Sequence, residues 1–418
     1  MKIGIIGAGA SGLTAAWLLQ ENHSVTVFEK QSRLGGHAHT VDVAVDGKLI
    51  PIDAAFDFFS EKLWPTFYRF LRLLKVELYK YPGTTTLYTA DNRRIYPMPA
   101  LRNGGLCWPL FKPHSISKML QFQRALQLGK ALVEASDSSV TVEQFTEGLP
   151  LSRSFKDEFC YPMLQAIWGV DRQEVKSFSA YNALKYFVLC DAGKFSQFYF
   201  TEVVGGSRTY IDTLVKSLTR SGIEAPVEIR RLTRTSGRHV VELLGGGRRE
   251  FDHLIIATNA LAARNLVAEL DPEGDLRSTL SEFEYFKGTI AIHGDKRLMP
   301  ASRKDWSVFN IRHEADNSAL TIWKKWKSEA PIFKSWVGHE PIQPEPLHFT
   351  ETYDHPIVSP RYFKAQRRVA ALQGRDNLWL AGLYTHDIDS HESAILSAIN
   401  VARRLDPQSP NLSRLIAP

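Results

Sequence analysis

The chain has 418 residues and a net charge of +6, and 44% of its residues are hydrophobic. This length allows two or three hydrophobic cores, or one large discontinuous fold. The modest positive excess contains no strongly basic block, which argues against nucleic acid as a partner.

Three cysteines, Cys107, Cys160 and Cys190, are widely separated and show no metal-ligand spacing. They predict buried, reduced thiols in a cytoplasmic protein and no metal site. No run of about eighteen uninterrupted apolar residues occurs, so we expect no membrane-spanning helix. The first strand begins at Ile3, and we therefore expect no signal peptide.

The first predicted element is a buried parallel strand, Ile3 to Ile6, which runs directly into a glycine turn. In that turn, Gly7 allows a tight bend, Gly9 allows the backbone to approach a pyrophosphate, and Gly12 allows close contact between strand and helix. The helix predicted over Ser11 to Leu19 offers unpaired N–H groups and the positive end of its dipole to phosphates. This order of elements predicts a dinucleotide-binding βαβ unit.

The second predicted strand, in the run SVTVFEK, ends at Glu29. A carboxylate at this distance from the glycines is suited to accept hydrogen bonds from the ribose hydroxyls of adenosine. It disfavours a 2′-phosphate and so argues against NADP, whereas NAD and FAD both stay open at this point.

The next run, KQSRLGGHAHTVDV, contains a second glycine pair, Gly35 and Gly36, between Arg33 and His37. A simple NAD dehydrogenase has no need of this second turn, whereas an extended flavin requires the chain to pass close to its pyrophosphate and ribityl groups. The run resembles the E-x-x-x-R-x-G-G-(R/H)-x-x-T signature of the flavin-dependent amine oxidase superfamily. This resemblance implies that the cofactor is FAD.

The resemblance returns at later segments and covers nearly the whole chain. APVEIRRL is similar to the strand whose valine, here Val227, binds adenine through its backbone, and FDHLIIATNA is similar to the strand that rejoins the nucleotide domain. NLWLAGLYTHDIDSHESAILSAINVARRL resembles the closing segment, a strand and then a helix whose N-terminus faces the flavin ring. AIWGVDRQEV and VVGGSRTYIDTL are similar to a bacterial subgroup of amine-oxidase-like flavoproteins found near cyclopropane-fatty-acid synthases.

The glycine turns and the resemblance together predict a set of FAD-binding residues but no catalytic side chain. We interpret His391 as packing against the ring rather than as a proton donor. No cysteine falls in the closing segment, where monoamine oxidases carry a thioether, so we expect noncovalent FAD. The predicted set is Gly7, Gly9, Ala10, Ser11, Gly12, Glu29, Lys30, Arg33, Gly35, Gly36, His37, Phe56, Val227, Gly382, Ser390, His391, Glu392 and Ala394.

Two stretches depart from the superfamily pattern. In IDAAFDFF, Asp53 is followed by Ala55 where glycine is usual. In the closing loop, Asp389 and Ser390 stand where glycine and an aromatic residue commonly precede the HE pair. That aromatic residue forms one wall of a cage for amines in monoamine oxidases, and Tyr353 alone supplies only the other wall. The departure counts against simple amine oxidation.

The expected fold is α/β, with a discontinuous Rossmann-like FAD-binding domain and an inserted substrate domain of mixed sheet and helices, as in amine oxidases. The FAD-binding domain is expected over residues 1–75, 198–283 and 376–418. The substrate-binding domain is expected over residues 76–197 and 284–375.

Three further features allow two interpretations each. The basic amphipathic stretch Ser115 to Glu134 suits a membrane surface, but we favour a packed globular helix and leave peripheral membrane contact open. IWKKWK suits single-stranded nucleic acid, but we favour an exposed strand edge protected by lysines. Trp168 fits a cavity wall and a core position equally well.

These features predict an FAD-dependent oxidoreductase, acting as oxidase, dehydrogenase or desaturase, in which the flavin takes a hydride from a substrate C–H bond. No separate NADPH fingerprint appears, so O2 is the expected acceptor. The weakened cage favours an apolar, lipid-like or specialised-metabolite substrate. A fatty-acid double-bond isomerase, a UDP-galactopyranose mutase, a simple amine oxidase and a non-enzymatic flavoprotein scaffold stay open as alternatives. The sequence leaves the oligomeric state undetermined.

Overall fold

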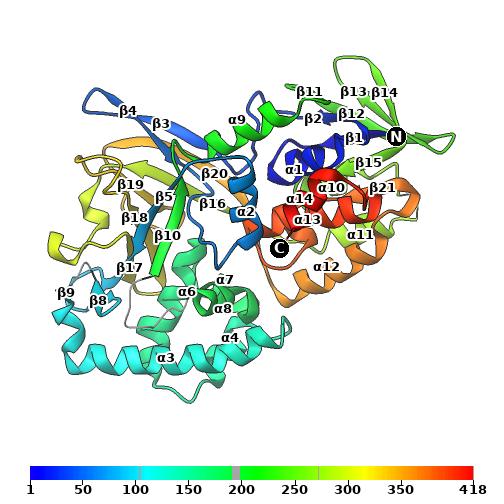
Figure 1. Cartoon of the computed structure of the whole chain (residues 1–418). Helices are drawn as coiled ribbons and strands as arrows, with labels where there is room; N and C mark the ends of the chain where they lie inside the picture. The colour runs from blue at the N-terminus through cyan, green and yellow to red at the C-terminus, as the bar shows by residue number, and fades with distance from the viewer. Residues whose placement is uncertain (103–104, 191–197, 272, 418) are drawn as a thin grey trace.

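The computed structural model describes residues 1–102, 105–190, 198–271 and 273–417. A parallel sheet lies on the right of Figure 1, and a larger mixed sheet lies on the left with a layer of helices below it. This arrangement confirms the predicted α/β class.

The parallel sheet has five strands in the order β11-β2-β1-β15-β21, and every neighbouring pair is parallel. Because its strands come from three distant parts of the chain, the sheet is discontinuous in sequence. The strands are β1 (Lys2–Ile6), β2 (Ser24–Phe28), β11 (Ser221–Glu224), β15 (His253–Ile256) and β21 (Leu378–Leu380).

Both faces of this sheet are buried, as its near-continuous apolar strands require. Ile3 and Ile5 belong to one core and Ile6 to the other. The first core holds α1 (Ala10–Leu19), α2 (Pro65–Leu73), α9 (Ser207–Ser217), α13 (His391–Leu405) and α14 (Pro410–Ile416). The second holds α10 (Ala260–Leu266), α11 (Asp275–Leu280), α12 (Pro360–Leu372) and a small sheet of β12 (Ile229–Thr235), β13 (Arg238–Leu243) and β14 (Arg248–Phe251).

The mixed sheet has seven strands in the order β20-β16-β19-β18-β17-β6-β7. Only the β17–β6 pair is parallel among these strands. Their bounds are β6 (Thr85–Thr89), β7 (Ile95–Met98), β16 (Tyr285–His293), β17 (Phe309–Glu314), β18 (Asn317–Trp323), β19 (Phe333–Trp336) and β20 (Leu347–Pro356).

A helical layer shares an aromatic-rich core with this sheet, and α3, α6 and α8 are visible below it in Figure 1. The layer consists of α3 (Pro113–Glu134), α4 (Val142–Gly148), α5 (Arg153–Phe155), a π-helical turn η2 (Lys156–Cys160), α6 (Tyr161–Trp168), α7 (Arg172–Ser177) and α8 (Ala180–Leu189). Among the described residues, no helix has both the length and the apolar composition needed to cross a membrane.

Short elements join the lobe that carries the parallel sheet to the lobe that carries the mixed sheet. The hairpin of β3 (Thr40–Val45) and β4 (Lys48–Asp53) packs against the mixed sheet through a small apolar cluster, and β5 (Leu78–Gly83) pairs with β10 (Phe198–Val203). The remaining pieces are β8 (Leu101–Arg102), β9 (Gly105–Leu106) and the 3-10 turns η1 (Trp108–Phe111), η3 (Lys296–Leu298), η4 (Arg303–Asp305), η5 (Arg375–Asn377) and η6 (Leu383–Thr385).

Candidate active site

The turn between β1 and α1 is closed by glycine contacts. A Cβ atom on Gly12 would lie 1.9 Å from the carbonyl oxygen of Gly7, so no larger residue fits without displacing the turn. Gly9 caps α1 without any side-chain hydrogen bond, and the first turn contains no acidic residue. Among the described residues, no side chain therefore caps the N-terminal N–H groups of α1, and this helix end is suited to bind an anion.

The second glycine pair lies directly against this turn. The Gly35 N–H donates to the carbonyl oxygen of Ala8 at 2.8 Å, and a Cβ on Gly36 would lie 3.3 Å from the Cα of Gly9. Arg33 braces the pair by donating from Nη1 to the Gly36 carbonyl oxygen at 2.8 Å. Two stretches of bare backbone thus face one another, which leaves room for a ligand to approach the main chain.

Glu29 follows β2 at the edge of the same cradle. Its carboxylate accepts hydrogen bonds from the Ala8 N–H at 2.8 Å and the Gln31 N–H at 2.9 Å, one on each oxygen. Because a carboxylate has about four acceptor positions, it retains capacity for ligand hydroxyl groups.

The N-terminus of α13 meets the start of α1. The Ser11 hydroxyl donates to the carbonyl oxygen of Ala394 at 3.0 Å, which joins two helices that are 383 positions apart. Ser390 caps α13 by accepting from the Ser393 N–H at 3.0 Å. The N-terminal ends of α1 and α13 therefore form one wall.

His391 is part of an aromatic stack beside this wall. The centroids of the His391 and Phe56 rings are 4.1 Å apart, and the angle between the ring planes is 12°. The Nε2 atom of His391 lies 2.6 Å from the hydroxyl oxygen of Tyr210. Burial lowers the pKa of His391 to about 3, so the ring is neutral at physiological pH. A neutral ring held in a stack is suited to packing rather than to donating a proton.

A cavity of about 720 Å³ begins at the cradle and extends into the mixed-sheet lobe. Fourteen of the residues predicted from the sequence line it: Gly7, Gly9, Ala10, Ser11, Glu29, Arg33, Gly35, Gly36, His37, Phe56, Gly382, Ser390, His391 and Ala394.

The other four predicted residues do not line this cavity. Gly12 packs inside the turn, and Lys30 is exposed beside Glu228, with 3.4 Å between Nζ and Oε1. Val227 lies between β11 and β12, where its N–H donates to the Glu29 carbonyl oxygen at 2.7 Å. The Glu392 carboxylate turns away and accepts from the Thr66 and Phe67 N–H groups at 2.9 and 2.7 Å, which caps α2.

The far part of the cavity has mainly apolar walls. They come from both the helical layer and the mixed sheet, and include Met119, Phe122, Met163, Phe187, Phe200 and Phe309. Trp168 also lines the cavity although its side chain is almost fully buried, so it serves both roles that the sequence allowed.

Asp389 is a buried acid in this apolar region that sequence reasoning did not place in the site. Its Oδ2 accepts from Trp168 Nε1 at 2.8 Å and lies 3.9 Å from Nδ1 of His355, while Tyr186 donates to its backbone oxygen at 2.7 Å. Burial raises the pKa of Asp389 to about 7 and lowers that of His355 to about 4. The cavity thus contains a carboxyl group that changes its protonation near neutral pH.

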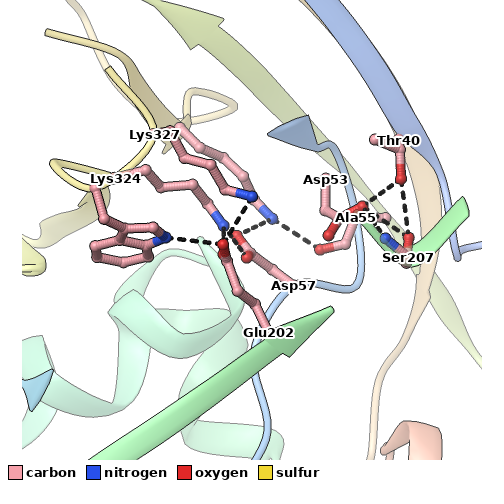
Figure 2. Close-up of polar contacts among 10 residues, drawn as sticks. Thr40, Asp53, Ala55, Asp57, Glu202, Ser207, Lys324 and Lys327 are labelled. Atoms are coloured by element: carbon pink, nitrogen blue, oxygen red, sulfur yellow. Dashed lines mark hydrogen bonds and ion pairs between the residues drawn. The ribbon is translucent and has the colours of Figure 1, made fainter. Parts of the chain in front are cut away.

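A buried ion cluster lies behind the wall that carries Phe56, and Figure 2 shows its members side by side. Lys324 contacts both Asp57 and Glu202, and Glu202 also accepts from Lys327 at 2.7 Å. Burial raises the pKa of Asp57, but the nearby lysines outweigh it and lower that pKa to about 2. Asp57 is therefore ionised at neutral pH, and its contacts with the lysines hold the cluster in place.

This cluster corrects the expectation that the lysines of IWKKWK protect an exposed strand edge. β18 lies inside the mixed sheet, and the Lys324 side chain is only 2% exposed. The apolar surroundings are tolerated because Lys324 is compensated by two carboxylates.

Lys334 extends the cluster to the cavity surface. Its ammonium donates to Asp57 Oδ2 at 3.0 Å and to the Ala55 carbonyl oxygen at 2.8 Å. Asp53, in the same stretch, accepts from Thr40 and Ser207. These contacts fix the segment leading to Phe56, including Ala55 at the position where glycine is usual.

The comparison with known protein families agrees with this geometry. The model of the family described as flavin containing amine oxidoreductase matches residues 10–300, which is more than half of the chain. The chain belongs to this family. It is an FAD-dependent oxidoreductase, and the uncapped end of α1 and the bare glycine backbone fit a dinucleotide diphosphate.

Solved structures share the fold at low sequence identity. The CLA-producing fatty acid isomerase from P. acnes is 16% identical with a TM-score of 0.71, covering 97% of this chain and 98% of that one. Cyclohexylamine oxidase from Brevibacterium oxydans is 17% identical with a TM-score of 0.66, covering 97% and 99%. An oxidoreductase from Methanosarcina mazei is 13% identical with a TM-score of 0.66, covering 96% and 100%.

A curated relative matches over a short segment. An uncharacterized protein from Methanocaldococcus jannaschii is 61% identical over 36 residues, which is 9% of this chain and 9% of that protein.

Proposed function

We propose that this flavoprotein removes a hydride from a C–H bond of an apolar, lipid-like or specialised-metabolite substrate, with O2 as the electron acceptor. The observation that carries the proposal is the apolar cavity that is continuous with the nucleotide cradle. Bound FAD supplies the hydride acceptor. An apolar wall excludes water from the reacting carbon and selects substrates that lose little solvation on entry.

We propose that the fourteen cavity-lining residues of the predicted set hold the cofactor noncovalently. The end of α1 is placed to bind the diphosphate, and Glu29 the ribose. Phe56 and the N-terminus of α13, which are brought together by the His391 stack, are suited to contact the ring. We also propose the domain division expected from the sequence, residues 1–75, 198–283 and 376–418 against 76–197 and 284–375.

We assign Asp389 the task of exchanging a proton with the substrate. Its carboxyl group lines the cavity, is fixed by the Trp168 N–H, and titrates near neutral pH. Such a group can take up a proton in one protonation state and return it in the other. Lys334, which Asp57 and the Ala55 carbonyl oxygen hold in place, adds an ammonium group to the same lining.

The proposal is tested by anaerobic mixing of the FAD-loaded protein with two probes, linoleic acid and n-octylamine, while the flavin absorbance is followed. Lasting bleaching with the fatty acid, and reoxidation on admission of air, are the expected results. Reaction with the amine alone would overturn the apolar substrate class.

The alternative without net redox change has a different signature in the same experiment. The fold shared with the fatty acid isomerase keeps this alternative open. A double-bond isomer formed from linoleic acid, with no lasting bleaching, would favour the isomerase and overturn the proposed oxidation.

A further inference from the structure

Exposed apolar side chains gather where the helical layer begins. Trp108 and Phe111 of η1 are 72% and 43% exposed, and Ile116 and Leu120 of α3 are 42% and 61% exposed. Leu106, just before η1, is 53% exposed. These five residues, which we call the α3 apolar surface, are five of the thirteen large apolar side chains that are exposed in the described part of the chain. They fall within fifteen consecutive positions, so their exposure is not scattered.

The structure anchors this segment and turns these side chains outward. Leu110 and Cys107 are buried in a small cluster with Ala100, against which Met119 packs. Trp108 and Phe111, from the same turn, lie on the other side with 5.7 Å between their ring centroids. The turn therefore has an inner side that fixes it and an outer side that is aromatic.

The charged residues of the segment that carries this surface are of one sign. Residues 92–133 contain seven lysines and arginines and no aspartate or glutamate. Arg94 and Lys118 pair with Glu158 from another helix. Lys112 and Arg124 are exposed, and neither pairs with a carboxylate in the part of the chain that the structure describes. An anionic partner is therefore favoured.

We propose that the α3 apolar surface docks on an anionic lipid bilayer, with Trp108 and Phe111 in the headgroup region and Lys112 and Arg124 facing lipid phosphates. Aromatic side chains next to basic residues are the composition of interfacial anchors. The same helix carries Met119 and Phe122, which line the apolar cavity, on its inner side. Docking thus places a source of lipid-like molecules beside the cavity wall.

The experiment is co-sedimentation of the FAD-loaded full chain with phosphatidylcholine vesicles, with and without about one third phosphatidylserine. We expect binding that increases with phosphatidylserine. The double variant W108S/F111S should weaken binding about tenfold or more, because two aromatic side chains no longer enter the interface. K112Q/R124Q should lose about fivefold per removed charge, and only on the anionic vesicles. Leu244→Ser, an equally exposed site in the β13–β14 turn, should bind as the parent does.

Each contrary result overturns the proposal. Absence of wild-type binding to the anionic vesicles does so, as does equal binding by W108S/F111S. If light scattering shows an oligomer that W108S/F111S converts to monomers, the surface is an interface between copies instead. FAD content and anaerobic flavin reduction with a substrate free in solution should be unchanged in W108S/F111S, so failure of docking and failure of the proposed reaction are told apart.

Discussion

At the scale of single residues, the carboxyl group of Asp389 makes stability depend on pH. Its pKa in the folded chain is about 7, whereas an aspartate in an unfolded chain has a pKa of about 3.9. Between these values the folded state binds more protons than the unfolded state. The contribution of Asp389 to the unfolding free energy is therefore present in full below about pH 4 and is lost as the pH rises through about 7.

Asp389→Asn removes this dependence and keeps an acceptor for the Trp168 N–H. Between pH 5 and pH 8, the wild type should lose about 2 to 3 kcal/mol of unfolding free energy relative to the variant. Urea unfolding of both proteins at the two pH values measures the difference. Parallel behaviour of the two proteins would show that Asp389 stays ionised in the folded chain.

Lys324 is the residue on which the buried cluster depends, because it touches both carboxylates. Lys324→Met leaves Asp57 and Glu202 undercompensated in a dry environment and should cost about 3 kcal/mol or more of unfolding free energy. The neighbouring Lys325 is exposed, so Lys325→Met should change the unfolding free energy by less than about 0.5 kcal/mol. Thermal and urea unfolding compare the two, and equal effects would contradict the role given to Lys324.

Glu29 and Lys30 are adjacent in sequence but differ in their relation to the cavity. If Glu29 binds the ribose as proposed, Glu29→Gln should weaken FAD binding about tenfold or more, since a charged acceptor is lost. Lys30→Gln should leave FAD affinity unchanged because its side chain is exposed outside the cavity. Titration of the FAD-free protein with FAD measures the affinity of both variants. A larger loss of affinity in Lys30→Gln than in Glu29→Gln would show that Lys30 contributes to the cofactor site.

Residues were predictable where one local motif fixes their place. The glycines of the first turn and Glu29 lie within thirty positions of one another, so spacing alone brings them together. Asp57 and Lys324 are 267 positions apart, and Trp168 and Asp389 are 221 apart. Only the packing of the two lobes joins such pairs, and a single sequence carries no signal for their partnership.

At the scale of elements, Glu392 connects two helices. It belongs to the first turn of α13 but accepts from two N–H groups at the start of α2. A carboxylate at a helix N-terminus is stabilising because it satisfies unpaired donors and interacts favourably with the dipole.

Glu392→Ala should therefore lower the unfolding free energy by about 1 to 2 kcal/mol. Glu392→Gln, which keeps one acceptor, should have a smaller effect. FAD affinity should stay unchanged, as measured by titration. Weaker FAD binding with unaltered unfolding would instead support the flavin contact that the sequence resemblance implied.

The predictability of an element followed its composition. β1, α1 and β2 carry continuous apolar runs around a glycine turn, and the structure has them where the pattern predicts. β7 carries no such run, because Pro97 interrupts it, and the structure places β7 at the edge of the mixed sheet, where proline is tolerated. The prediction of an exposed edge at the end of β18 was wrong, because the buried Lys324 that follows this strand looks in sequence like an exposed lysine.

At the scale of the whole molecule, the last helix secures the first. Asn411 at the start of α14 donates to the carbonyl oxygen of Trp17 at 2.8 Å, and Leu412 and Leu415 are buried in the core that holds α1. Contacts between the two ends of the chain thus close the lobe that carries the parallel sheet, where Figure 1 shows α14 beside α1.

Two adjacent residues of α14 test this closure. Leu415 is fully buried, whereas Ile416 is 40% exposed. Leu415→Ala should cost about 2 to 5 kcal/mol of unfolding free energy, and Ile416→Ala less than about 1 kcal/mol. Calorimetry of the FAD-free proteins compares them, and similar losses would mean that α14 does not stabilise this lobe.

The dependence of the cradle on β21 and α13 has a consequence during synthesis. These elements lie in about the last tenth of the chain, so the ribosome releases β1, the glycine turn and β2 long before their partners exist. Until then the apolar strands have unpaired edges, which are prone to aggregation. We therefore expect a chaperone to bind the nascent chain. We therefore expect the cofactor to bind only after synthesis of β21 and α13.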